Sequence, residues 1–312
     1  MDFFEIVENN DETKKMVILI KRTDISFINA IRRIMMLHTR EYAFDDIEIK
    51  NNDTVFNDEF IKHRINLIPL TMNSQMTFTC DIENPTNNYK YVLSNDLIPV
   101  DSNIPYTIMD NIPIVVLNSG EHIQFSAKTN NNCGNKNIMY SPIITCYFSN
   151  LKKIKTKDVN ENVKNFMYND YFYGHKYLLK SIDYQETDDY AMTFQTILKN
   201  PVDIFIETLH KCHFMMDEMK QKHFEIDIEH EKFYGFSIDN IDYSQASIFV
   251  YILNSMPSIV LATYTNNNNS KKFFFKIEFK HEKTSIQKLL NHTMDYAKKT
   301  FDVMLKDFKT LI

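Results

Sequence analysis

The sequence predicts an α+β fold in which two similar units follow each other along the chain. Residues 224–312 show the order strand, helix, strand, strand, long helix, and the first half shows the same order once residues 47–170 are set aside. Each half ends in a long helix with one apolar face. Two such helices in one polypeptide are expected to pack against each other, which would make the chain an internal pseudo-dimer.

These patterns divide the 312 residues into three predicted domains. The first dimerisation unit takes residues 1–46 and 171–224. A mostly β domain is inserted at residues 47–170, and the second dimerisation unit takes residues 225–312. The length agrees with this division, because a chain of this size usually forms about two domains and buries a large core.

The first unit opens with a short apolar run at residues 16–20, which predicts a buried strand. Asp24 can cap the helix that follows, whose apolar residues recur at helical spacing: Phe27, Ile28, Ile31, Ile34, Met35 and Leu37. Further strands are predicted at residues 177–183 and 190–198, after the inserted domain.

The inserted domain begins with a predicted strand at residues 47–49 and a short helix. Asp58 is the expected N-cap of this helix and Asn66 its end, while Phe60, Ile61 and Ile65 share a side. An extended segment at residues 67–70 follows. Strand-like runs separated by Asn, Pro and Ser then predict a mostly β domain: residues 76–82, 89–93, 112–117, 122–127 and 140–148. Residues 150–169 have the composition of an exposed linker or loop.

The first long helix is predicted to begin at Asn200 and Pro201, as N-cap and first helical residue. The second long helix is predicted from Thr284, which can form a capping box with Gln287, to about Phe308. Strands at 233–238, 259–264 and 273–279 and a helix at 243–253 lie between them. The predicted pseudo-dimer interface consists of apolar residues on the two long helices: Phe205, Leu209, Met216, Leu290, Ala297, Phe301, Met304 and Phe308.

The composition excludes several classes of protein. Only 4 glycines are present, so no Gly-rich phosphate loop of the P-loop or dinucleotide-binding type exists. A net charge of -6 argues against a protein that binds nucleic acid directly, because affinity for the phosphate backbone comes from clustered Lys and Arg. Any contact with DNA is therefore expected to be indirect. The N-terminal segment is acidic and lacks an apolar signal region, which predicts a protein that is neither secreted nor membrane-embedded.

The cysteines and histidines give no pattern typical of a metal site. Cys80, Cys133, Cys146 and Cys212 form no CxxC pair, so neither a disulfide framework nor a structural zinc site is predicted, and the expected compartment is intracellular and reducing. His210 and His213 are spaced i, i+3 and could bind a metal, but Cys212 belongs to the apolar stripe and no further ligand stands at a suitable spacing. We therefore predict no metal and no cofactor.

Three segments close together resemble consecutive motifs of one protein family. Residues 25–35 (ISFINAIRRIM), 43–45 (AFD) and 52–70 (NDTVFNDEFIKHRINLIPL) are similar, in this order, to the motifs of the α-like subunits of cellular DNA-directed RNA polymerases. Gly120-Glu121, Gly134 and residues 140–142 (YSP) resemble the family's inserted domain. The helix that opens at Asn200 stands where the family has its dimerisation helix.

The last ninety residues resemble the smaller partner of that subunit, the eleventh subunit of eukaryotic polymerase II or archaeal subunit L. The similarity covers residues 236–238, 242–251 and 259–264. Val250 replaces the usual Arg, residues 246–247 replace Gly-Asn, and asparagines at 266–269 replace a Pro-His-Pro turn. The whole chain thus resembles a fusion of the third and eleventh subunits (archaeal D plus L), as found in polymerases of large cytoplasmic DNA viruses.

This resemblance implies a non-catalytic subunit of an enzyme complex, a nucleotidyltransferase that carries out DNA-templated transcription. It implies a platform for the second-largest (β-like) and largest (β′-like) catalytic subunits, with a small zinc-binding subunit as a further partner and no membrane contact. No catalytic residue is expected in this chain. If the source is viral, the resemblance implies viral transcription in the host cytoplasm and packaging in a virion.

The resemblance also implies which residues face these partners. Two adjacent arginines are usually a solvated helix face, but within the family's motif Arg32 and Arg33 are expected at a partner, with Arg33 at the second-largest subunit. Asn29 belongs to the same motif. Three more residues match the later motif and are expected to face a partner, although their local roles alone would be a cap, a first-turn charge and an exposed polar face, and Asp58 is expected to have both roles: Asp58, Glu59 and Arg64.

Two other functions stay open as alternatives. One is a metal-dependent enzyme that uses His210 and His213, which metal analysis would reveal. The other is a stand-alone nucleic-acid-binding module, which would bind DNA in a salt-dependent manner.

Overall fold

The computed structural model describes residues 3–100, 104–154, 167–168, 171–172, 184–230, 232–266, 272–281 and 284–312. The chain forms two compact units. The first, here called the core unit, comprises Met1–Met35, Thr145–Phe194 and Pro201–Ile312; the second, the β unit, comprises Met36–Ile144 and Gln195–Asn200. The domain boundaries at residues 47 and 170 stay a prediction, and the strand predicted at residues 177–183 lies outside the described residues.

The first sheet has the strand order β1-β2-β14-β11-β13-β12. β1 (Phe4–Asn10) pairs antiparallel with β2 (Lys15–Ile20), and the remaining strands are β11 (Ile143–Ile154), β12 (Met167–Tyr168), β13 (Tyr171–Phe172) and β14 (Tyr184–Thr196). Helix α1 (Ile25–Leu37) follows β2, and the Asp24 carboxylate accepts the Ser26 N–H at 2.7 Å. The predicted strand at 16–20 and the capped helix are therefore confirmed, whereas β1 was not predicted.

The second sheet has the order β15-β16-β18-β17, all antiparallel. Its strands are β15 (Phe224–His230), β16 (Phe233–Asp239), β17 (Ile259–Asn266) and β18 (Lys272–Phe279). Helix α5 (Tyr243–Ser255) connects β16 to β17 and packs against the sheet through Phe249, whose ring lies 5.3 Å from that of Phe275. The predicted order of elements is confirmed here, with β15 as an additional edge strand.

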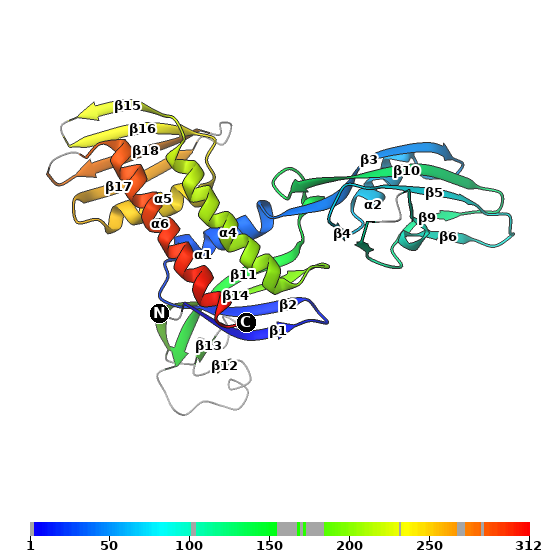
Figure 1. The fold of residues 1–312 in the computed structure, drawn as a ribbon, viewed down its shortest axis with the longest axis horizontal. Helices are drawn as coiled ribbons and strands as arrows, with labels where there is room; N and C mark the ends of the chain where they lie inside the picture. The colour runs from blue at the N-terminus through cyan, green and yellow to red at the C-terminus, as the bar shows by residue number, and fades with distance from the viewer. Residues whose placement is uncertain are drawn as a thin grey trace. The chain divides into compact units, whose positions relative to one another are not determined.

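Two long helices, α4 (Pro201–Lys220) and α6 (Ile286–Lys309), run side by side in the core unit (Figure 1). Both were predicted, because each carries an apolar stripe on one face. The predicted capping box of Thr284 and Gln287 is wrong: Ser285 is the N-cap of α6, and its hydroxyl accepts the Lys288 N–H. None of the helices in the described part of the chain combines the length and hydrophobicity needed to cross a membrane.

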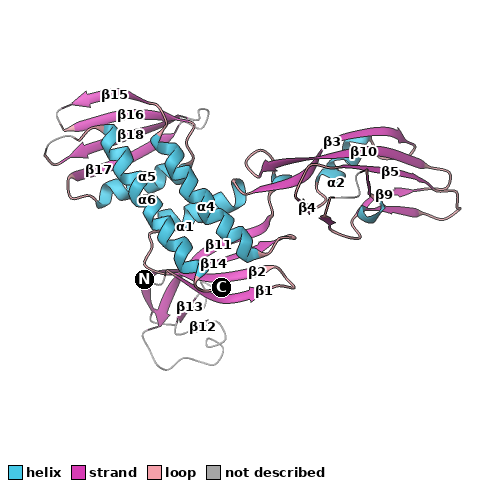
Figure 2. Ribbon diagram, viewed as in Figure 1, coloured by secondary structure: helices cyan, strands magenta, loops and turns pink. Residues whose placement is uncertain are grey.

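The β unit consists mainly of strands (Figure 2). A four-stranded sheet has the order β3-β10-β5-β7, and two smaller sheets pair β4 with β8 and β6 with β9. Their bounds are β3 Arg40–Asn52, β4 Leu70–Met72, β5 Thr77–Glu83, β6 Lys90–Leu93, β7 Ile98–Pro99, β8 Tyr106–Ile108, β9 Pro113–Leu117 and β10 His122–Cys133, with short 3-10 helices at Ser94–Asp96 and Ile138–Tyr140. Its core includes Phe44 and Phe78, which contact edge to face at 5.4 Å.

Helix α2 (Asp58–Asn66) lies between β3 and β4. The prediction that Asp58 is its N-cap is wrong by one residue: Asn57 is the cap, and its side-chain oxygen accepts the Phe60 N–H at 2.8 Å. Phe60 also differs from Ile61 and Ile65, with which it was expected to share a side. Both isoleucines are fully buried, but Phe60 is 43% exposed.

Candidate functional site

The contact between α4 and α6 forms an apolar seam inside the core unit. The ring centroids of Phe205 and Phe308 lie 4.6 Å apart, and Phe4 from β1 contacts both rings edge to face. Burying aromatic and aliphatic side chains on this scale is a main source of stability. Every residue predicted for the pseudo-dimer interface is at most 1% exposed: Phe205, Leu209, Met216, Leu290, Ala297, Phe301, Met304 and Phe308.

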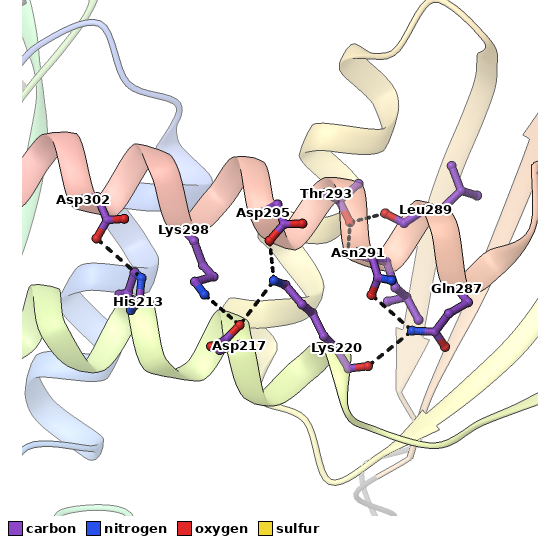
Figure 3. A network of polar contacts seen from close by, with 11 residues as sticks. His213, Asp217, Lys220, Gln287, Leu289, Asn291, Thr293, Asp295, Lys298 and Asp302 are labelled. Atoms are coloured by element: carbon purple, nitrogen blue, oxygen red, sulfur yellow. Dashed lines mark hydrogen bonds and ion pairs between the residues drawn. The ribbon is translucent and has the colours of Figure 1, made fainter.

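A row of charged contacts borders this seam (Figure 3). The row joins α4 to α6 in antiparallel register. His213 contacts Asp302 at 3.5 Å, and two ion pairs follow in order, Asp217 to Lys298 at 2.8 Å and Lys220 to Asp295. Beyond the last bridge, the Gln287 amide donates to the carbonyl of Lys220. Because the side chains are partly exposed, each bridge contributes about 0.2–1 kcal/mol at most. The row therefore sets the register of α4 against α6 more than it stabilises the protein.

The charge states within the row reinforce each other. Hydrogen bonds from Lys298 and then Lys220 lower the pKa of Asp217 below its usual value. The hydrogen bond to Asp295 raises the pKa of Lys220. Each opposite charge favours the ionised form of its neighbour, so these groups stay charged at neutral pH.

Arg33 on α1 contacts the start of α5. Its Nη2 donates to the Asp242 carboxylate at 3.1 Å, and its guanidinium carbon lies 5.5 Å from the centre of the Tyr243 ring. The Arg33 side chain remains 24% exposed. This ion pair was not predicted, because the two residues are 209 positions apart and only local spacing can be judged from one sequence.

Asp242 is itself held from two sides. It is the N-cap of α5: its carboxylate accepts the Ser244 N–H, and its own N–H donates to the side chain of Gln245. The Gln245 amide then donates to the carbonyl of Met215 on α4 at 2.6 Å. A continuous set of polar contacts thus connects α1, α5 and α4.

The two other predicted partner residues of α1 lie next to each other. The Arg32 Nε donates to the side-chain oxygen of Asn29 at 3.1 Å, and both side chains are half-buried. On the buried side of the same helix, Phe27 contacts Tyr251 of α5 and Phe301 of α6. The helix α1 is therefore fixed by the second half of the chain while its polar side remains partly accessible.

The remaining predicted partner residues belong to α2 in the β unit. Asp58 accepts a hydrogen bond from Asn52 at 2.8 Å, and the exposed Glu59 pairs with Lys62 at 3.4 Å. Arg64 donates to the backbone carbonyl of Pro113 and lies over the Phe60 ring. Arg64 thus fastens α2 to β9, in addition to any role it has at a partner.

An exposed apolar surface beside α2 was not foreseen. The rings of Phe56 and Phe60 stack at 5.1 Å, and Val55 and Leu67 are exposed on the segments that flank the helix. Exposed apolar side chains that cluster on a soluble protein often mark contact sites for other proteins, and the Phe56–Phe60 stack is such a pair. The sequence did not predict this surface, because helical periodicity alone does not show that Phe60 is exposed while its neighbour Ile61 is buried.

The side chains considered for metal binding are engaged differently. His213 faces Asp302 across the seam, Cys212 is buried, and His210 is exposed. Within the described ranges, no three His, Cys, Asp or Glu side chains lie close enough together to hold a metal ion. The four cysteines form no disulfide, and burial raises the pKa of the Cys80 and Cys146 thiols to about 12.

Comparison with known proteins gives the chain distant relatives. No protein-family model matches it. It is 28% identical to DNA-directed RNA polymerase subunit Rpo3 of Methanobrevibacter smithii over 168 residues, which cover 48% of this chain and 60% of that protein. Identity is also 28% to Rpo3 of Methanocaldococcus jannaschii, over 60% of this chain and 87% of that protein. The chain is 30% identical to DNA-directed RNA polymerase II subunit rpb3 of Dictyostelium discoideum, over 44% of this chain and 54% of that protein.

These similarities have a limited extent. The matched part of the chain spans about three fifths of the length of the Methanobrevibacter protein. Several relatives from archaea and eukaryotes nevertheless carry the same kind of name, and their identities to this chain are similar. Over about half of its length, the chain is therefore distantly homologous to the Rpo3 and rpb3 subunits of DNA-directed RNA polymerases.

Proposed function

We propose that this protein is a non-catalytic assembly subunit of a multisubunit DNA-directed RNA polymerase. In this role it is the platform on which the β-like and β′-like catalytic subunits assemble, and it touches DNA only through the complex. The observation that carries the proposal is the homology to Rpo3 and rpb3 over half of the chain. A net charge of -6 is consistent with a surface that contacts other proteins rather than nucleic acid.

In this proposal the second half of the chain corresponds to a smaller partner subunit. It is fused to the first half, and the two halves pack together as an internal pseudo-dimer. Crosswise contacts support this: Phe27 on α1 contacts α6 through Phe301, while Gln245 on α5 contacts α4 through Met215. Each short helix therefore contacts the long helix of the other half. Reciprocal contacts of this kind are what a two-fold related pair produces.

The proposed partner surfaces are those of α1 and α2. Arg33 is assigned to the second-largest subunit, because its side chain remains 24% exposed after pairing with Asp242. Asn29 and Arg32 of the same helix are assigned to a partner as well. Three residues of α2 form the other assigned surface, next to the apolar Phe56–Phe60 stack: Asp58, Glu59 and Arg64. The small zinc-binding subunit is the further proposed partner. The fused order of the two halves resembles that of polymerases of large cytoplasmic DNA viruses, and on this ground the proposal includes a viral source with transcription in the host cytoplasm.

Affinity purification of the tagged protein from its native source tests this function. We expect two very large subunits and a small zinc-binding subunit to co-purify with it. Arg33→Ala should reduce recovery of the second-largest subunit, and Arg40→Ala, which also removes one arginine from the chain, is the matched control. A protein that elutes only as a free monomer or homodimer would overturn the proposal.

The same preparation separates the two alternatives. Stoichiometric zinc that is lost on His210→Ala and His213→Ala would favour a metal-dependent enzyme, although His213 already faces Asp302. Salt-dependent binding of DNA by the purified chain alone would favour a nucleic-acid-binding module.

A further inference from the structure

The short helices α1 and α5 begin in the same way. Each has 13 residues and follows an aspartate, and each aspartate accepts the N–H of a serine at the second helical position at 2.7 Å. The two aspartates are Asp24 and Asp242. With the helices aligned on these caps, the ninth residue is Arg33 in α1 and Tyr251 in α5.

The ninth residue of each helix lies near the capping aspartate of the other. Arg33 pairs with Asp242 at 3.1 Å. Burial, and then the negative charge of Asp24, raise the pKa of Tyr251. The arrangement is therefore reciprocal in position but not in charge, because among the described residues an ion pair is present at Asp242 but not at Asp24.

The contacts of Asp242 fix the orientation of the Arg33 side chain. One carboxylate oxygen caps α5 and the other accepts from Arg33, and Gln245 ties the same turn to the Met215 carbonyl on α4. A free arginine side chain loses rotamer entropy when a partner immobilises it. Arg33 is already held by Asp242 and the Tyr243 ring, so it has lost part of this rotamer entropy before a partner binds.

We propose that Asp242 is a positioning residue that presents the Arg33 guanidinium to the second-largest polymerase subunit. This inference rests on the proposed function. It adds that the second half of the chain, which supplies Asp242, prepares the partner site on the first half. Arg33 is thus presented for capture only when α5 is docked against α1 and α4.

The test uses full-length variants and the purified second-largest subunit from the same source. Asp242→Asn keeps an oxygen that can cap α5 but removes the charge that holds Arg33. Asp24→Asn makes the identical change at the equivalent cap, which has no ion pair among the described residues. We measure the Kd for the second-largest subunit by biolayer interferometry and the melting temperature by circular dichroism.

We expect Asp242→Asn to weaken capture about tenfold, which corresponds to about 1.4 kcal/mol, while Asp24→Asn leaves it unchanged and both variants melt cooperatively. In an Arg33→Ala background, Asp242→Asn should have no further effect on the Kd, which a purely structural role would not predict. If Arg33→Ala weakens capture but Asp242→Asn does not, the positioning role is wrong and the proposed function stands. If Arg33→Ala leaves capture unchanged, the assignment of Arg33 and this inference fail together.

Discussion

Phe205 and Phe308 meet with their ring centroids 4.6 Å apart and join the last helix of the first half to the last helix of the second. Phe4 packs edge to face against both rings, and the N–H groups of Phe3 and Phe4 donate to the Asp307 carboxylate at 2.7 and 2.9 Å. The first strand of the chain is therefore fastened to its last helix. The stability of both halves should depend on one shared seam.

Phe301→Asp should disrupt this seam. Phe301 is 1% exposed and its ring lies 5.4 Å from that of Phe27, so the substitution would place an unpaired carboxylate among aromatic side chains. Removing a large buried ring costs about 3–5 kcal/mol, and an unpaired buried charge adds to that loss. We expect loss of cooperative unfolding in circular dichroism. Tyr296→Asp, at a position of α6 that is 55% exposed, is the control and should melt close to the unmodified protein.

Lys298→Asp tests the row of charges beside the seam. The substitution places two carboxylates opposite each other where Asp217 and Lys298 now pair at 2.8 Å. We expect a loss of about 1 kcal/mol, seen as a fall in melting temperature of about 2–4 °C. The double variant Asp217→Lys with Lys298→Asp should recover only part of this, because the new lysine would stand beside Lys220, which now pairs with Asp217 at 3.2 Å. About 1 M salt should shrink the difference.

Lys299→Asp provides the comparison for that experiment, since Lys299 is exposed on the same helix and makes no ion pair with any described residue. An equal fall in melting temperature for Lys299→Asp and Lys298→Asp would show that the row has no specific role.

The four cysteines should differ sharply in reactivity. Cys80, Cys146 and Cys212 are buried, and burial raises the pKa of each thiol, so almost no thiolate is present at neutral pH. Cys133 is partly exposed at the end of β10. We expect Ellman's reagent to modify one thiol rapidly in the native protein and all four in denaturant, with Cys133→Ser removing the rapid phase. Rapid modification of two or more native thiols would contradict this.

The sequence predicted those elements that bury one continuous face. β2, α1, α4 and α6 carry uninterrupted apolar runs or stripes, and each was located within a few residues. β1 (FEIVENN) and β15 (FEIDIEH) were missed because an edge strand has a neighbour on one side only and keeps many polar residues. The contact between Arg33 and Asp242 could not be predicted from the sequence, since it depends on how the two halves of the chain pack against each other.

The N-caps show a second limit of sequence-based prediction. At α2 and at α6 the predicted cap is the direct neighbour of the observed one: Asp58 instead of Asn57, and Thr284 instead of Ser285. All four residue types are favourable caps, so composition alone does not choose between neighbours. The backbone decides, because the cap must have an extended conformation, which Asn57 adopts with φ -72° and ψ 156°.

Alanine substitutions at the two neighbours test this assignment. Asn57→Ala removes the side-chain oxygen that accepts the Phe60 N–H at 2.8 Å and should cost about 1 kcal/mol. Asp58→Ala removes a first-turn carboxylate and a hydrogen bond from Asn52, both at the exposed surface, and should cost about half as much. Chemical denaturation followed by far-UV circular dichroism measures both. A larger loss for Asp58→Ala than for Asn57→Ala would return the capping role to Asp58, because the residue that accepts a free N–H of the first turn should contribute more to the stability of the helix than its neighbour.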